Sequence, residues 1–240
     1  MRRRAIDLAA ESGQPVTLMG EAGQENYYRD GYALVEGAAP GIVARKLLGF
    51  LHRDLTQNPG VLKNFLSQSP ITKKPSYEFY GYRHPTVWGF HWGLTSRMAT
   101  LTGKRLAPTY AYFRVYSKDD LCIVHSDRES CEHSFSMALG YSDDVIWPFE
   151  IDDTGRDFQT ARAMAPANDF GDASPRTVML NPGDAILYQG CAYRHGRTTP
   201  NPNRWSAHLF LHWVDLDGPF ADFAFDKQNM PDPGDFEFPG

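Results

Sequence analysis

The sequence predicts a mainly β protein in which α-helices flank an antiparallel barrel or sandwich. Apolar residues recur at helical spacing in two stretches before residue 103, and from Pro108 onward the hydrophobic period changes to two. Turn-forming residues then separate a series of short β-like runs. Together these observations favour a β core with helices packed on one side.

The length and composition indicate one domain. A chain of 240 residues with 42% hydrophobic and 13% aromatic content can bury a sizeable core. We expect four segments: a flexible N-terminus (1–25), a helical flank with a lid (26–107), the β core (108–214) and an irregular C-terminal tail (215–240).

The charge pattern argues against nucleic acid and membranes as partners. The 29 acidic and 24 basic residues are spread without long blocks of like charge. No apolar run reaches membrane-spanning length, and the basic start at Met1 is followed by a polar stretch instead of the apolar core of a secretory signal. Three cysteines without a C-x-x-C pair argue against a disulfide framework. We therefore expect a cytoplasmic protein.

Two helices and one strand are expected before the β core. Residues 30–37 have the pattern of a first strand. The first helix is predicted by the apolar positions Val43, Leu47, Leu48, Leu51 and Leu55, and the second by Val87, His91, Leu94, Met98 and Leu101. Gly103 can end the second helix in the left-handed conformation. Residues 66–85 between them are predicted to be a long connection, within a segment (61–86) that could form a lid.

The β core is expected to begin with a strand whose two faces differ. Tyr110, Tyr112, Arg114 and Tyr116 lie on one face of this strand. Further strands are predicted at 121–125, 134–141, 145–151, 177–180, 185–188, 193–197 and 205–214, with a long polar loop before Pro175.

A histidine and an aspartate end the apolar run 121–125. Because side chains alternate along a strand, His125 and Asp127 point to the same side. An imidazole and a carboxylate make two thirds of the facial ligand set of non-haem Fe(II) sites. A surface turn would give the same short pattern, so the third ligand decides between the two interpretations. His195, near the end of a later strand, is the candidate.

A carboxylate receptor is predicted close to His195 in the sequence. Arg204 and Ser206 share one face of the last strand, and a guanidinium fork beside a hydroxyl suits a carboxylate. Arg197, two residues after His195, is the alternative for this role. His91 is predicted to be a core residue, because it lies on an apolar helical stripe.

These motifs, taken in order, resemble one enzyme family. They are Arg114-Val115-Tyr116, Leu121, His125-Ser126-Asp127-Arg128, Asn181-Pro182-Gly183-Asp184, His195 and Arg204-Trp205-Ser206. The sequence looks like the Fe(II)/2-oxoglutarate-dependent oxygenases, nearest the prolyl-4-hydroxylase-like branch. The resemblance implies a double-stranded β-helix (jelly-roll, cupin-like) core, with Fe(II) bound by His125, Asp127 and His195. It also implies 2-oxoglutarate and O2 as cosubstrates, with Arg204, Ser206 and Tyr116 binding 2-oxoglutarate.

The resemblance implies hydroxylation of an unactivated C–H bond in a small molecule, such as an amino acid or a natural-product intermediate. Candidate substrate-binding residues are Arg128, Arg197, Tyr112 and Tyr110. Two alternatives stay open: a cupin-like metalloprotein that uses the triad without 2-oxoglutarate, and a peptidyl hydroxylase. We expect a monomer or a homodimer.

Overall fold

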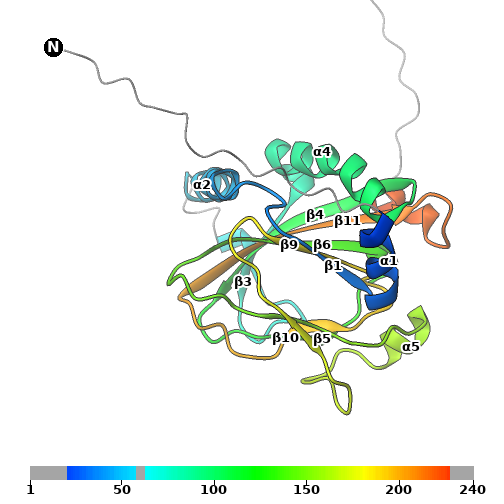
Figure 1. Cartoon of the computed structure of the whole chain (residues 1–240). Helices are drawn as coiled ribbons and strands as arrows, with labels where there is room; N and C mark the ends of the chain where they lie inside the picture. Colours follow the sequence, from blue (N-terminus) through cyan, green and yellow to red (C-terminus); the bar gives the residue numbers. More distant parts are fainter. Residues whose placement is uncertain (1–20, 58–62, 228–240) are drawn as a thin grey trace, which may run out of the picture.

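Two antiparallel sheets face each other in the computed structural model, which describes residues 21–57 and 63–227 (Figure 1). The larger sheet has the spatial order β1 (Tyr32–Val35), β9 (Ala185–Tyr188), β6 (His133–Tyr141), β11 (Trp205–Asp215), β4 (Leu106–Ser117), β3 (Ser76–Tyr80) and β2 (Leu66–Ser67). The smaller sheet has the order β5 (Cys122–His125), β10 (His195–Arg197), β7 (Phe149–Ile151) and β8 (Arg176–Val178).

Helices α2 (Gly41–Thr56) and α4 (Pro85–Thr102) cover the outer face of the larger sheet (Figure 1). Their apolar stripes, which include Leu47 and Met98, are buried in one cluster with Phe113 of β4. Gly103 adopts a left-handed conformation with φ of 65° and ends α4. Both predicted helices and the first predicted strand are confirmed.

Strand β4 separates two apolar layers, as its sequence predicts. Ala111 and Phe113 pack into the cluster under the helices, whereas Tyr112 and Tyr116 pack into a second cluster between the two sheets. Arg114 has the parity of these tyrosines and therefore also faces the space between the sheets. This space holds the functional side chains described below.

The later strands differ from the prediction mainly in length. β6, β9 and β11 lie close to their predicted ranges, but β7 covers only Phe149–Ile151 and β10 only His195–Arg197. Trp147, before β7, is buried with its indole N–H bonded to the Thr199 carbonyl, so this part of the chain pairs with a loop instead of a strand.

Two segments before the β core differ from the sequence-based expectation. Helix α1 (Glu21–Asp30) begins within the stretch expected to be a flexible N-terminus, of which residues 1–20 lie outside the described residues. The connection expected at 66–85 contributes β2 and β3 to the larger sheet, and residues 61–62 are not described.

The polar loop before Pro175 contains a helix that the sequence pattern did not reveal. This helix, α5 (Phe158–Ala163), has six residues and therefore shows too few turns for a periodic signal, although the Asp157 side chain caps it by accepting from the Thr160 N–H at 3.0 Å. The expected C-terminal tail includes a 3₁₀ segment, η4 (Ala221–Lys227), and its last part, 228–240, is not described.

His91 lies in the core, as predicted. It is fully buried, and its Nε2 is 2.9 Å from the backbone carbonyl oxygen of His212. In the described part of the chain, no helix combines the length and the apolar character needed to cross a membrane.

Candidate active site

The pairing of two short strands brings the predicted histidines together. His125 is the last residue of β5 and His195 the first of β10, and they are direct partners in the antiparallel ladder. Their ring centroids are 4.4 Å apart. The pairing of β5 with β10, which the sequence could only suggest, therefore places the two imidazoles next to each other.

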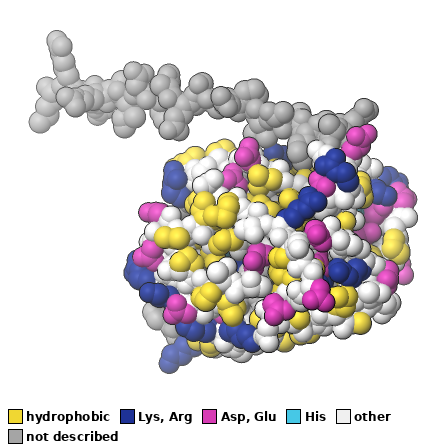
Figure 2. All heavy atoms as spheres, turned by 60° about the horizontal axis from the view of Figure 1, so that its bottom comes forward, with side chains coloured by type: hydrophobic (Ala, Val, Ile, Leu, Met, Phe, Trp, Pro, Cys, Tyr) yellow, Lys and Arg dark blue, Asp and Glu magenta, His cyan; other side chains and the backbone are white. Residues whose placement is uncertain are grey.

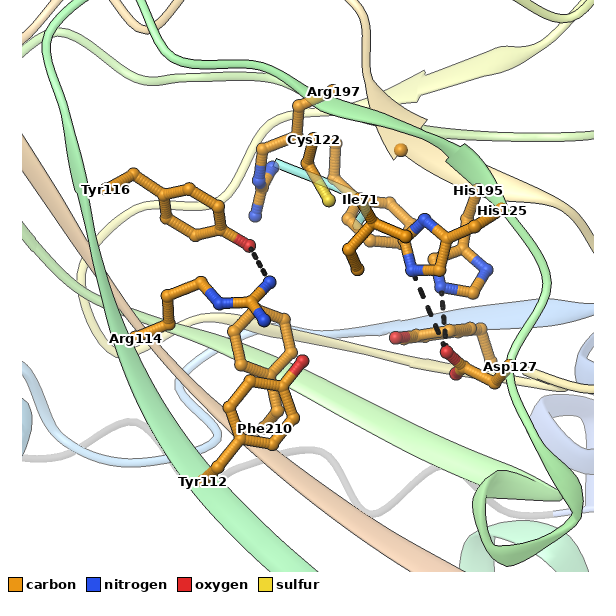
Figure 3. A pocket seen from close by; sticks show the side chains of 13 residues that line it. Ile71, Tyr112, Arg114, Tyr116, Cys122, His125, Asp127, His195, Arg197 and Phe210 are labelled. Carbon is orange, nitrogen blue, oxygen red and sulfur yellow. Dashed lines mark hydrogen bonds and ion pairs between the residues drawn. The ribbon is translucent and has the colours of Figure 1, made fainter. Parts of the chain in front are cut away.

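Asp127 completes the cluster two residues beyond His125. Its Oδ1 lies 3.8 Å from His125 Nε2 and 3.5 Å from His195 Nε2, and the three candidate ligand atoms lie within 4.8 Å of one another. The close-up shows the three side chains converging (Figure 3). We call His125, Asp127 and His195 the triad.

Neighbouring groups fix the orientation of the carboxylate. The Asp127 N–H donates to the Gly190 carbonyl at 2.9 Å, and Ser134 Oγ donates to Asp127 Oδ2 at 2.8 Å. A Cβ atom at Gly190 would lie 2.3 Å from Asp127 Oδ2, so only glycine allows this close approach. Oδ1 is thereby directed to the histidines.

Both imidazoles are oriented by the carbonyl two residues before them. His125 Nδ1 lies 2.8 Å from the Ile123 oxygen, and His195 Nδ1 lies 2.9 Å from the Tyr193 oxygen. With Nδ1–H as the donor in each case, Nε2 is the nitrogen that can bind a cation.

The electrostatics of the triad also suit a cation. Burial by itself raises the pKa of Asp127, but the imidazoles of His195 and His125 hold this pKa well below its usual range. Burial lowers the pKa of His125, but the Cys122 thiol and Asp127 outweigh it and raise this pKa to about 9. A cation bound at His125 Nε2 would take the place of that proton. The donor set and its oriented partners therefore fit a divalent transition metal such as Fe(II).

A second group of potential ligands shares Asp127 with the triad. Asp127, Cys131 and His212 also offer ligand atoms within 4.8 Å of one another. However, burial, together with the charge of Asp127, raises the pKa of the Cys131 thiol well above its usual range, whereas a metal ligand must be a thiolate. Ser134 Oγ is also 2.9 Å from His212 Nδ1 and links this histidine to Asp127 by hydrogen bonds. The triad is the better metal site.

A buried cavity, the inner compartment, extends from the triad into the space between the sheets. It is lined by the triad and by Ile71, Tyr112, Arg114, Tyr116, Cys122, Phe149, Tyr188, Gly196, Arg197 and Phe210. Its walls are aromatic and apolar apart from two arginines and a few polar groups. Such a cavity excludes bulk water and strengthens any charge interaction inside it.

The two arginines of the inner compartment differ in their partners. Arg114, from β4, pairs with Glu78 of β3, and its Nη1 donates to the Tyr116 hydroxyl at 3.3 Å (Figure 3). Arg197 is only 2% exposed, and its nearest polar contacts are the Trp147 carbonyl and His208 Nδ1, both at 3.2 Å. Among the described residues, no carboxylate forms an ion pair with Arg197. Burial lowers the pKa of His208 well below its usual range, and the positive charge of Arg197 lowers it further, so His208 stays neutral.

Arg204 does not face this cavity, and the prediction that it shares a strand face with Ser206 is wrong. Its side chain is 73% exposed and lies 3.4 Å from Asp143. The reason is that β11 begins only at Trp205, after a turn in which Asn201 and Asn203 bond to one another and to Ser206. Ser206 is buried in this polar turn and does not line the inner compartment.

A second pocket, the outer compartment, opens on the other side of the triad. It has a volume of about 240 Å³ and is lined by Pro70, Ile71, His125, Ser126, Asp127, Arg128, Arg162, Ala165 and Pro166. Ile71, His125 and Asp127 line both compartments, so the triad lies at their boundary.

The remaining candidates are distributed around the two compartments. Tyr112, Tyr116 and Arg197 line the inner one, and Arg128 lines the outer one. The Tyr110 hydroxyl lies 3.1 Å from Cys131 Sγ, and the guanidinium of Arg128 lies 4.3 Å from the Tyr110 ring centroid.

Several site residues were not predicted as such from the sequence, among them Arg114, Ile71 and Gly190. Strand parity with Tyr112 and Tyr116 could have identified Arg114. Ile71 enters the wall because its carbonyl accepts from the Ile123 N–H of β5 at 2.9 Å, a contact between distant segments that has no local signal. No sequence pattern marks Gly190 either. Its role is to leave space beside Asp127 Oδ2 that a Cβ atom would fill.

Comparisons with known proteins give a fold but no family. No protein-family model matches the chain, and no curated protein matches its sequence. Solved structures do match. The non-haem α-ketoglutarate-dependent carbocyclase SnoK from nogalamycin biosynthesis has a TM-score of 0.60 at 11% identity, covering 91% of this chain and 95% of its own.

Two further structures extend the comparison. EctD from S. alaskensis, solved with bound Fe, has a TM-score of 0.60 at 15% identity, covering 91% of this chain and 87% of its own. A prolyl-4-hydroxylase from Pseudomonas putida has a TM-score of 0.54 at 11% identity, covering 80% of this chain and 97% of its own. The predicted double-stranded β-helix fold is thereby confirmed.

Proposed function

We propose that the protein is an Fe(II)- and 2-oxoglutarate-dependent oxygenase. The observation that carries this proposal is the buried Arg197, which has no carboxylate partner among the described residues and lines the same cavity as the triad. A buried guanidinium without a counter-charge is costly unless an anion binds beside it. The fold shared with enzymes of this class supports the same function.

The triad would hold the iron, and 2-oxoglutarate would bind in the inner compartment, whose volume of about 20 Å³ would have to increase by movement of the lining side chains. Bound there, Fe(II) and its cosubstrate supply the activation of O2 and the oxidation of a C–H bond. Arg197 would bind the distal carboxylate, because a guanidinium fork can donate two charge-assisted hydrogen bonds to it. The Tyr116 hydroxyl accepts from Arg114 and keeps its own hydrogen to donate to the same carboxylate.

In this proposal, Arg114 acts differently from Arg197. Its charge is compensated by Glu78, so it contributes orientation more than net charge. Phe149, Tyr188 and Phe210 line the inner compartment around Arg114 and keep water away from the triad.

Arg197 replaces Arg204 as the proposed 2-oxoglutarate anchor.

For the reaction, we propose hydroxylation of a small molecule. The outer compartment suits a small substrate better than a long polymer, because about 240 Å³ accommodates a molecule of amino-acid size. Basic and acidic side chains are interspersed over the face shown in Figure 2, which offers no broad basic surface for a nucleic-acid backbone.

The test is anaerobic titration of the Fe(II)-loaded protein with 2-oxoglutarate, followed by the metal-to-ligand charge-transfer band. We expect a band in the wild-type protein. Arg197→Gln should weaken 2-oxoglutarate binding about 100-fold, since a buried charge-assisted pair is lost. Arg204→Gln is the matched control and should leave the titration unchanged. Metal content of each variant, measured separately, shows whether the iron site is intact.

Each outcome of the titration separates the candidate functions. Iron binding without a band would favour the cupin-like metalloprotein that does not use 2-oxoglutarate. Equal weakening by Arg197→Gln and Arg204→Gln would reject Arg197 as the anchor. Succinate release across a panel of amino acids, small acids and peptides then tests the small-molecule substrate against the peptidyl hydroxylase alternative.

A further inference from the structure

The outer compartment has a chemical character of its own. Besides the triad residues, its lining combines apolar side chains, among them Pro70 and Ile71, with two arginines, Arg128 and Arg162. Apart from the triad's Asp127, no acidic residue lines it. A ligand in this compartment therefore meets apolar surface and positive charge together.

The two arginines are not equally available to a ligand. Arg128 donates from Nη1 and Nη2 to the two carboxylate oxygens of Asp226, at 2.6 and 3.0 Å, and from Nη1 to Ser130 Oγ at 2.6 Å. Arg162 Nη1 lies 3.5 Å from a Glu129 carboxylate oxygen, which is too long for a good hydrogen bond, its guanidinium carbon lies 5.6 Å from the Phe158 ring centroid, and its side chain is 58% exposed. The Arg162 guanidinium is therefore held less tightly than that of Arg128 and is the more available of the two to a ligand.

Arg162 is held in place relative to the triad. It belongs to α5, and the chain after this helix is pinned to β5, next to His125. There, the Val124 N–H donates to the Ala167 oxygen at 2.9 Å, and the Ala167 N–H donates to the Val124 oxygen at 2.8 Å. The Ala165 N–H also bonds to the Arg162 carbonyl at 3.3 Å. Backbone pairing therefore places the backbone of Arg162 close to the triad, within reach of its side chain.

Ser126 adds to the outer compartment a polar atom that has no hydrogen-bond partner in the described part of the chain. It lies between His125 and Asp127 in the sequence and lines the outer compartment. Its Oγ is buried and has no hydrogen-bond partner among the described residues. A buried hydroxyl without a partner is unfavourable, so a bound ligand with an acceptor atom would satisfy it.

We propose that the substrate of the outer compartment is a small organic carboxylate whose anionic group binds the Arg162 guanidinium and whose apolar part lies against Ile71 and Pro70. The Ser126 hydroxyl donates to a second acceptor of the same molecule. This inference rests on the proposed function and names its substrate class. Arg162 is then a specificity-determining residue, since it selects for a negative charge in the outer compartment.

The test is a binding screen by ligand-observed NMR on the protein loaded with Zn(II), which is redox-inert, and saturated with 2-oxoglutarate so that the inner compartment is filled. The probes are small carboxylic acids, each paired with its primary amide, such as hexanoate with hexanamide and phenylacetate with phenylacetamide. Each amide keeps the carbon skeleton and removes the charge. We expect the acids to bind at least about tenfold more tightly than their amides.

Variants assign the preference to Arg162. Arg162→Gln should reduce the affinity for the acids about tenfold or more and leave the amides unchanged, and Arg162→Lys should be intermediate because it keeps the charge without the fork. The control is Arg176→Gln, an arginine outside both compartments that pairs with Asp30 at 3.3 Å. The inference is overturned if no acid binds, if acids and amides bind equally, or if Arg162→Gln leaves the preference intact.

The design separates this inference from the proposed function. If the wild-type protein fails to bind 2-oxoglutarate, the proposed function fails. The screen is then repeated without 2-oxoglutarate in an Arg197→Gln background, in which the inner compartment has lost its unpaired arginine. If 2-oxoglutarate binds normally to wild type and to Arg162→Gln, a missing acid preference counts against the substrate class alone.

Discussion

The inner and outer compartments meet at the same triad but are built in opposite ways. The arginines of the inner compartment, Arg114 and Arg197, are buried and come from strands β4 and β10. Those of the outer compartment, Arg128 and Arg162, are about half exposed and come from a loop and a six-residue helix. A buried strand can hold one defined ligand, whereas loops can vary without disturbing the core. In the proposed function, the inner compartment binds the cosubstrate and the outer compartment binds the substrate.

The largest effect is expected from removing one ligand of the triad, where the two compartments meet. His195→Ala takes one of the three ligands away, and we expect iron affinity to fall at least about 1000-fold. Competition with a chelator measures it. His52→Ala, an exposed histidine on α2, is the control and should bind iron like wild type. Retention of iron by His195→Ala would reject the triad as the metal site, and His212→Ala would then test the group of Asp127, Cys131 and His212.

The ion pairs of buried and exposed arginines should differ sharply in their contribution to stability. Glu78→Gln leaves Arg114 buried without its partner, and we expect the free energy of unfolding to fall by roughly 3–5 kcal/mol. Asp143→Asn removes the partner of the exposed Arg204, and its cost should be much smaller, because solvent screens an exposed ion pair. Denaturant unfolding measures both. Similar costs for the two variants would contradict the distinction between buried and exposed pairs.

Acid should destabilise the core around His133, which is hydrogen-bonded to the buried Tyr27. Burial lowers the pKa of His133 to about 4, whereas an unfolded histidine titrates near 6.5. Between these values the unfolded state binds more protons at this residue, so the contribution of His133 to stability is complete above about pH 6.5 and falls by about 3 kcal/mol as the pH approaches 4. Denaturant unfolding at several pH values measures the loss. His133→Asn, which preserves an acceptor for Tyr27, should show a shallower decline, and an unchanged slope would exclude His133 as the cause.

The smallest effect concerns the charge balance of the outer compartment. Asp226→Asn releases Arg128 from its ion pair, and we expect small carboxylates to bind about two- to fivefold more tightly. The NMR screen on carboxylates and amides measures the change, and the amides should not respond. Unchanged carboxylate affinity would show that Arg128 does not reach the bound ligand.

The sequence by itself determined the local features of the site. Hydrophobic spacing predicted α2, α4 and the two faces of β4, because these depend on residues only a few positions apart. The His125 and Asp127 pair was visible for the same reason. The sequence pattern also singled out His195, which the structure places beside them through strand pairing.

Only the tertiary structure decided which arginine faces which cavity. Strand parity favoured Arg204, but this parity holds only within a strand, and β11 begins one residue later, after the turn formed by Asn201 and Asn203. Arg197 is buried because β10 pairs on both sides, with β5 and β7. The positions of Ile71 and Arg162 likewise depend on contacts with β5 across more than 40 residues of sequence. Such contacts are set by packing between distant segments, which leaves no periodic trace in the chain.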